Sequence, residues 1–169
     1  ALENADNHYY LDGCPIREEP LHLIPRSLRP QFEEILGVHI EGDLCPLCRH
    51  RLIEEFGGVY EDFPVRETSF SQRGRRGISV VPPMDANSQD VSVLIGTEDI
   101  SKLDMYSEDD PRVLSLNGAF NVGNRGIVEF VEVFKNEIEF LHTMLTATQE
   151  KRVPSPGKND MIYFDGVIL

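Results

Sequence analysis

The sequence predicts an α/β fold in which helices cover a mostly parallel β-sheet. The first observation is an apolar run at residues 126–134, GIVEFVEVF, which only Glu129 and Glu132 interrupt. A strand that is apolar on both faces is typical of a sheet buried between helices. The second observation is a change to helical spacing immediately afterwards. The apolar stripe of that helix is expected to consist of Ile138, Leu141, Leu145 and Thr148.

The N-terminal part of the chain predicts one short strand and two helices. Residues 8–11, HYYL, form the strand candidate. A first helix is expected to begin near Pro25 and to end at Gly37, because proline favours helix starts and glycine favours helix ends. Residues 46–56 predict a second helix, for which Asp43 is the expected cap.

Two strands follow, and we expect them to form a hairpin. Residues 65–71 alternate between the two faces of a strand, and residues 77–81 are a compact apolar run. The segment between them, QRGRR at residues 72–76, is the expected turn. Its three arginines either bind a phosphate or an acidic peptide or form a solvated tip, and we favour the solvated tip.

The remaining elements are shorter. Residues 91–95 predict a short helix or an extended segment, and residues 103–111 predict an acidic loop. The stretch VPSPG at residues 153–157 predicts another loop. A final strand is expected at residues 161–169, buried in the sheet.

The composition excludes several classes of protein. The chain of 169 residues has 16 basic and 29 acidic residues, a formal charge of −13, which disfavours a nucleic acid partner. No apolar run approaches the roughly 20 residues that a membrane helix needs, and no signal-peptide pattern opens the chain. Three cysteines, an odd number, favour a reducing compartment. We therefore expect a cytoplasmic protein without a membrane partner.

The two ends indicate how the chain relates to a larger protein. It begins at Ala1 without a methionine and stops at Leu169 inside an apolar run, without a turn or cap. From these features we expect an internal fragment of a longer protein.

The pair Cys45 and Cys48 has the spacing of half a zinc site. Completing it would require Cys14 or the two nearby histidines, His39 and His50. The alternatives are a redox dithiol or two small buried side chains, and the buried side chains are the favoured interpretation. The sequence alone therefore assigns no metal ligand.

Several separated motifs resemble known ATPases. The L-x-G-x-x-D segment at residues 94–99 and the GNRG turn at residues 123–126 are similar to AAA+ ATPases of the magnesium-chelatase type. A larger set of motifs resembles the PrkA family of bacterial and archaeal proteins, described as serine protein kinases. That set comprises residues 12–52, the SQD at 88–90, NRGIVEFVEVFK at 124–135 and LTATQE at 145–150.

The resemblance implies a partial P-loop NTPase fold of the AAA+ three-layer type, in which this chain lacks the P-loop strand. Residues 1–64 would be a family-specific, α-rich insert. Residues 65–169 would be the central part of the AAA+ core, with the Walker B strand and the start of the sensor strand. The full-length protein would use ATP and Mg²⁺, act on a protein substrate and assemble as a homo-oligomer.

The resemblance also implies site residues. Glu132 aligns with the catalytic glutamate that polarises the attacking water, while Val131 stands where an aspartate on the metal side is usual. Glu129 is the second catalytic candidate. It lies two residues before Val131, and residues two apart on a strand point to the same face of the sheet. Asn124 and Arg125 in the turn before the strand are candidate nucleotide contacts.

A phosphate-binding motif of the form G-x-x-x-x-G-K-[ST] does not occur in the sequence. The resemblance implies that it precedes Ala1, so we expect this chain alone to be inactive. The motifs of eukaryotic protein kinases do not occur either. The expected function is an ATP-dependent serine protein kinase. The alternatives are an AAA+ ATPase linked to protein remodelling or proteolysis, and a non-catalytic interaction module.

Overall fold

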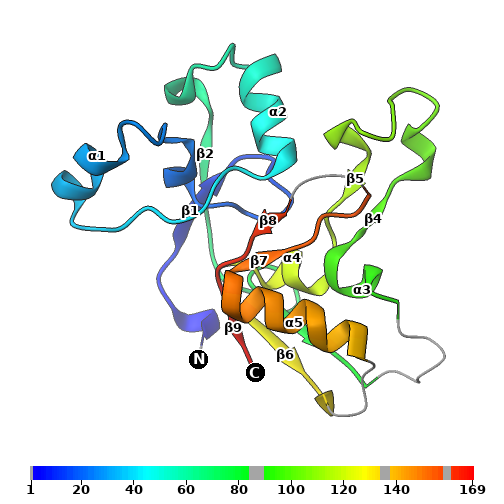
Figure 1. Cartoon of the computed structure of the whole chain (residues 1–169). Coiled ribbons are helices and arrows are strands. Elements are labelled where there is room, and N and C mark those ends of the chain that lie inside the picture. The colour runs from blue at the N-terminus through cyan, green and yellow to red at the C-terminus, as the bar shows by residue number, and fades with distance from the viewer. Residues whose placement is uncertain (1, 84–89, 134–137, 158–160) are drawn as a thin grey trace.

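A three-stranded parallel sheet forms the centre of the fold (Figure 1). The computed structural model describes residues 2–83, 90–133, 138–157 and 161–169. Within them the sheet has the order β3 (Ile78–Val81), β6 (Ile127–Phe130) and β9 (Val167–Ile168), and both pairs of neighbours are parallel. Helices flank this sheet, so the prediction of an α/β fold with a parallel sheet is confirmed.

Strand β6 buries one face rather than two. Val128 and Phe130 are buried, and the ring of Phe130 lies 5.9 Å from that of Phe120 in α4 (Ala119–Gly123). Glu129 lies on the opposite face and is exposed, as is its register partner Val80 on β3. The prediction of burial on both faces is therefore wrong for the described residues. Alternation along a strand places the carboxylate on the solvent side.

Helix α5 (Ile138–Glu150) packs through a different face from the one predicted. Phe140, Thr143 and Ala147 are buried, whereas Ile138 is 68% exposed and Leu145 is 50% exposed. The buried residues Phe140, Thr143 and Ala147 are spaced i, i+3 and i+7, so they also form a helical stripe. The helix carries apolar residues on two stripes. The stripe with one aromatic ring and two small side chains is the one that enters the core beside β7 (Arg152–Val153).

The predicted hairpin is not formed. Strand β2 (Val65–Thr68) pairs antiparallel with β1 (His8–Leu11), whereas β3 pairs with β6. An isolated bridge between Ser71 and Arg76 retains the tight turn between β2 and β3. The more apolar β3 joins the central sheet, and the largely exposed β2 stays outside it. The β1–β2 pairing joins residues on both sides of the predicted boundary at residue 64, and the division itself stays a prediction.

The two N-terminal helices are α1 (Arg29–Leu36) and α2 (Pro46–Glu54). Helix α1 ends at Gly37 as predicted, but it buries none of its residues. Helix α2 begins at the predicted residue, but its cap is Cys45 rather than Asp43. Asp43 instead forms an ion pair with Arg26. The carboxylate that was predicted to cap the helix therefore contacts an arginine outside the helix instead.

The final strand is also interrupted. Strand β8 (Ile162–Tyr163) pairs antiparallel with β7, and the chain then turns before β9 enters the central sheet. Val167 is 54% exposed, so this strand is not buried as predicted. A further short pair joins β4 (Thr97–Glu98) to β5 (Leu114–Ser115) after α3 (Ser92–Ile95). The 3₁₀ helices are Leu2–Asn4, Pro20–Leu23, Tyr60–Asp62, Ile100–Lys102 and Pro111–Val113.

Among the described residues, no helix combines the length and the apolar character that a membrane span requires.

The packing of α5 predicts different effects for two substitutions. Phe140→Ala removes a ring that is 1% exposed, and we expect it to cost about 3–5 kcal/mol because a cavity remains. Leu145→Ala, on the exposed side of the same helix, should change the stability by no more than about 0.5 kcal/mol. Hydrogen exchange of the α5 amides in the full-length protein measures both effects. A larger loss of protection for Leu145→Ala would show that α5 packs through the other stripe.

Candidate functional site

The carboxyl ends of the three parallel strands meet at one edge of the central sheet. The N–H of Val131 donates to the carbonyl of Val81 at 3.0 Å, and the N–H of Phe130 donates to the carbonyl of Leu169 at 2.8 Å. Residues that follow β6 therefore emerge between the ends of β3 and β9. In open α/β sheets, ligands bind outside the carboxyl ends of the strands. This edge is the place where the chemistry of a nucleotide is expected.

Glu132 lies directly beyond this edge. Its side chain is exposed, and its backbone has φ of 58°, in the left-handed region that non-glycine residues seldom adopt. Such conformations cluster at functional sites, where the surrounding structure offsets their cost. A carboxylate held there can accept a hydrogen bond from a water molecule outside the sheet edge.

Glu129 lies on the same strand but not at its end. Glu132 is three positions further along the chain, which corresponds to about 10 Å of extended backbone. Its side chain is exposed on the face that Val131 also occupies by alternation. Carboxylate oxygens are suitable ligands for Mg²⁺, whereas the valine that stands at the usual position of the aspartate offers none.

Asn124 lies at the opposite end of β6 and is 8% exposed. Its side-chain amide donates to the carbonyl of Ile16 at 3.0 Å, and its side-chain oxygen accepts from the N–H of Asp165 at 3.0 Å. The residue thus joins the N-terminal segment, the start of β6 and the turn before β9.

Arg125 continues this connection. Its guanidinium donates to the carbonyl of Tyr9 and pairs with Glu19, and its backbone φ is 62°. Because Glu132 is seven positions further along the chain, the two residues lie about 20 Å apart along an extended backbone. Asn124 and Arg125 therefore do not share a site with Glu132. A nucleotide contact by these two residues stays a prediction and would need a ligand other than the one that reaches Glu132.

A pocket of about 300 Å³ opens at this amino end of the sheet. Three carboxylates line it, and the arginine in its wall is already paired with one of them. A pocket of this charge disfavours phosphate. Its polar lining residues are Glu19, His22, His39, Glu41, Asn124, Arg125, Tyr163 and Asp165.

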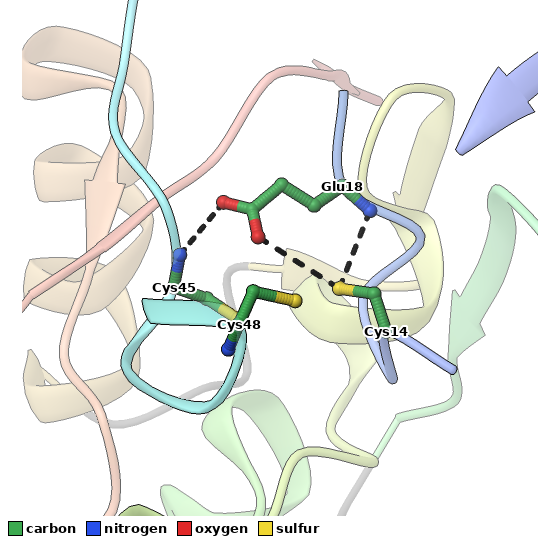
Figure 2. Close-up of side chains that lie close together, drawn as sticks. All are labelled: Cys14, Glu18, Cys45 and Cys48. Carbon is green, nitrogen blue, oxygen red and sulfur yellow. Dashed lines mark hydrogen bonds between the residues drawn. The ribbon is translucent and has the colours of Figure 1, made fainter. Parts of the chain in front are cut away.

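A second group of reactive side chains lies inside the N-terminal half (Figure 2). The potential ligand atoms of Cys14, Glu18, Cys45 and Cys48 all lie within 4.8 Å of one another, and all four residues are buried. We call this group the thiol cluster. Burial raises the pKa of the Glu18 carboxyl group, against a hydrogen bond with His22 that lowers it.

The sequence identified only part of the thiol cluster. Of the alternatives considered to complete the Cys45 and Cys48 pair, the structure brings Cys14 into place. His39 is instead 76% exposed at its side chain and pairs with Glu33 at 2.8 Å. The sequence analysis did not predict Glu18, because it is one of two adjacent glutamates in the segment REEP at residues 17–20 and nothing in that segment marks it as a ligand. The sequence feature that could have indicated its contacts is its spacing of four residues from both Cys14 and His22.

Comparisons with known proteins give consistent matches. The family model of the PrkA AAA domain matches residues 1–169. The chain is 46% identical over 162 residues to the "ATP-dependent protease PrkA" of Bacillus subtilis, covering 95% of this chain and 26% of that protein. It is 35% identical over 162 residues to the "Serine/threonine kinase YeaG" of Escherichia coli K12, covering 94% of this chain and 25% of that protein. The chain thus spans about a quarter of the length of these curated relatives.

The contacts of Asn124 predict the effect of its removal. Asn124→Ala leaves the buried carbonyl of Ile16 without its donor, which we expect to cost about 1–3 kcal/mol. Hydrogen exchange in the full-length protein should then show faster exchange in the segment around Ile16 and at the start of β9. The control is Asn7→Ala, which alters an exposed asparagine in a loop. Equal exchange in the two variants would show that the Asn124 amide does not hold these segments.

Proposed function

The chain belongs to the PrkA AAA domain family, and from this premise we propose that its central sheet carries the hydrolytic part of an ATP site in a serine protein kinase. The observation that supports the proposal is the position of Glu132 beyond the carboxyl end of the middle strand. This is where an AAA+ sheet presents its water-activating carboxylate. The full-length protein would act on a protein substrate, as a homo-oligomer in the cytoplasm.

Glu132 would act as a general base in this site. Its carboxylate would accept a hydrogen bond from the attacking water and take up a proton as the new P–O bond forms, while the bond between the γ-phosphorus and the bridging oxygen breaks and ADP leaves. When bound, ATP would supply the phosphoryl group, and Mg²⁺ would neutralise the charge on its oxygens. Glu129 is the residue of this strand that offers an oxygen on the metal side, in place of the aspartate that Val131 replaces.

The names of the relatives support two different activities. The Escherichia coli relative is named as a serine/threonine kinase, which supports our proposal. The Bacillus subtilis relative, at the higher identity, is named as an ATP-dependent protease, which supports an ATPase linked to proteolysis as the second candidate. Both activities require ATP, and in each Glu132 would take up the proton of the attacking hydroxyl group, which belongs to water in the ATPase and to the acceptor serine in the kinase.

Glu132→Gln tests the hydrolytic role. The amide keeps the size of the side chain but cannot take up a proton, so ATP turnover by the full-length protein should fall about 10²–10⁴-fold. ATP affinity should remain at the wild-type value, because binding does not depend on the base. Steady-state hydrolysis and equilibrium ATP binding are the two measurements.

Two further variants serve as comparisons. Glu67→Gln alters an exposed glutamate in another strand and should leave turnover unchanged. Glu129→Gln should raise the Mg²⁺ concentration needed for half-maximal turnover, because one metal-side oxygen is lost. Wild-type turnover in Glu132→Gln would refute the assignment of the base.

Phosphotransfer distinguishes the kinase from the protease. The wild-type full-length protein, given radiolabelled ATP and the unstructured protein casein, should transfer label to serine, and phosphoamino acid analysis should identify phosphoserine. Degradation of casein that requires ATP, without labelled serine, would instead support the second candidate.

A further inference from the structure

We propose that Cys14, Cys45, Cys48 and Glu18 bind one zinc ion, which holds the N-terminal segment against helix α2. The four residues come from two parts of the chain, a loop at residues 14–18 and the start of α2. Figure 2 shows the three sulfur atoms and the carboxylate facing one another. This site lies outside the ATP chemistry proposed above.

The distances fit a tetrahedral zinc ion. With zinc–sulfur bonds of about 2.3 Å, ligand atoms at the corners of a tetrahedron lie about 3.8 Å apart. The four potential ligand atoms here lie within 4.8 Å of one another, so small side-chain movements suffice to reach that spacing. Four protein ligands without an open position are typical of a structural rather than a catalytic zinc site.

The backbone around the sulfur atoms is arranged to support thiolates. Both segments begin with the dipeptide Cys-Pro. The N–H of Cys48 donates to the sulfur of Cys45 at 3.4 Å, and the N–H of Glu18 donates to the sulfur of Cys14 at 3.5 Å. Hydrogen bonds to a charged acceptor favour the charged form, which is the form that binds metal.

The burial of the Glu18 carboxylate favours a bound cation beside it. The residue is 2% exposed, and a buried carboxylate is costly unless it is paired or bound to a metal. Among the described residues, the ion-pair partner of Glu18 is His22, at 3.2 Å from Oε1. The same oxygen accepts from the N–H of Cys45 at 2.7 Å. These contacts fix Oε1 and leave Oε2, which faces the thiol of Cys14, as the ligand atom.

Two other interpretations of the thiol cluster are less well supported. A redox dithiol needs an accessible sulfur for exchange, but Cys45 is 1% exposed and Cys48 is 0% exposed. A purely apolar cluster of cysteines does not account for a charged group in its midst. Soft thiolate ligands with one carboxylate favour zinc over Mg²⁺ or Ca²⁺.

Metal analysis of the full-length protein tests the proposal. The protein is purified without a polyhistidine tag, and zinc is measured by mass spectrometry of the elements. Each of Cys14→Ser, Cys45→Ser and Cys48→Ser should contain one zinc ion per chain less than the wild type. His39→Ala and His50→Ala are the controls and should keep the wild-type content. His22→Ala should keep the ligands but bind zinc about 10–100-fold more weakly, because it removes the support of Glu18.

A second measurement keeps the test valid if a serine variant does not fold. Wild-type protein stripped of metal and reconstituted with Co²⁺ should show the sulfur-to-cobalt charge-transfer band and the intense visible bands of a tetrahedral site. Zinc content that is the same in the wild type and the folded serine variants would overturn the proposal. So would a cobalt spectrum without a sulfur band, or a native disulfide between Cys45 and Cys48.

Discussion

The buried side chain of Asn124 connects three segments that are far apart in the sequence, and the geometry of the sheet depends on this connection. Its side-chain amide donates a hydrogen bond to the carbonyl of Ile16, and its side-chain oxygen accepts one from the N–H of Asp165. Two residues after Asp165 the chain enters β9, where Val167 stands in register with Ile127 of β6. Through these two hydrogen bonds Asn124 links the turn before β6 to the turn before β9. Asparagine suits this role, because its side chain offers both a donor and an acceptor.

The two ends of β6 therefore have separate tasks. At the amino end, the loop at residues 14–18 is held from one side by Asn124 and from the other by the thiol cluster. A zinc ion there would fix the loop whose carbonyl Asn124 contacts. At the carboxyl end, the backbone leaves the sheet in a left-handed conformation and presents Glu132. The acidic pocket at the amino end is unsuited to phosphate.

The sequence was most informative where a local pattern determines the outcome. The apolar run around Val128 predicted β6, and the glycine after Leu36 predicted the end of α1. Partners across the chain could not be predicted in this way. The spacing of α5 is compatible with two apolar stripes, and only the space beside β7 decides that Phe140 rather than Leu145 is buried. Strands β2 and β3 are close in sequence, yet each pairs with a distant strand. Folding brings Glu18 to the three cysteines, and its place in the sequence does not by itself indicate a metal ligand.

The most direct test is an experimental structure of the full-length protein with a non-hydrolysable ATP analogue and Mg²⁺. We predict that the γ-phosphate lies beyond the carboxyl end of β6, with a water molecule between it and the carboxylate of Glu132. In that structure Asn124 should keep its contacts with Ile16 and Asp165 at the other end of the strand. A nucleotide bound instead in the pocket lined by Asn124 and Arg125 would contradict the separation of the two ends.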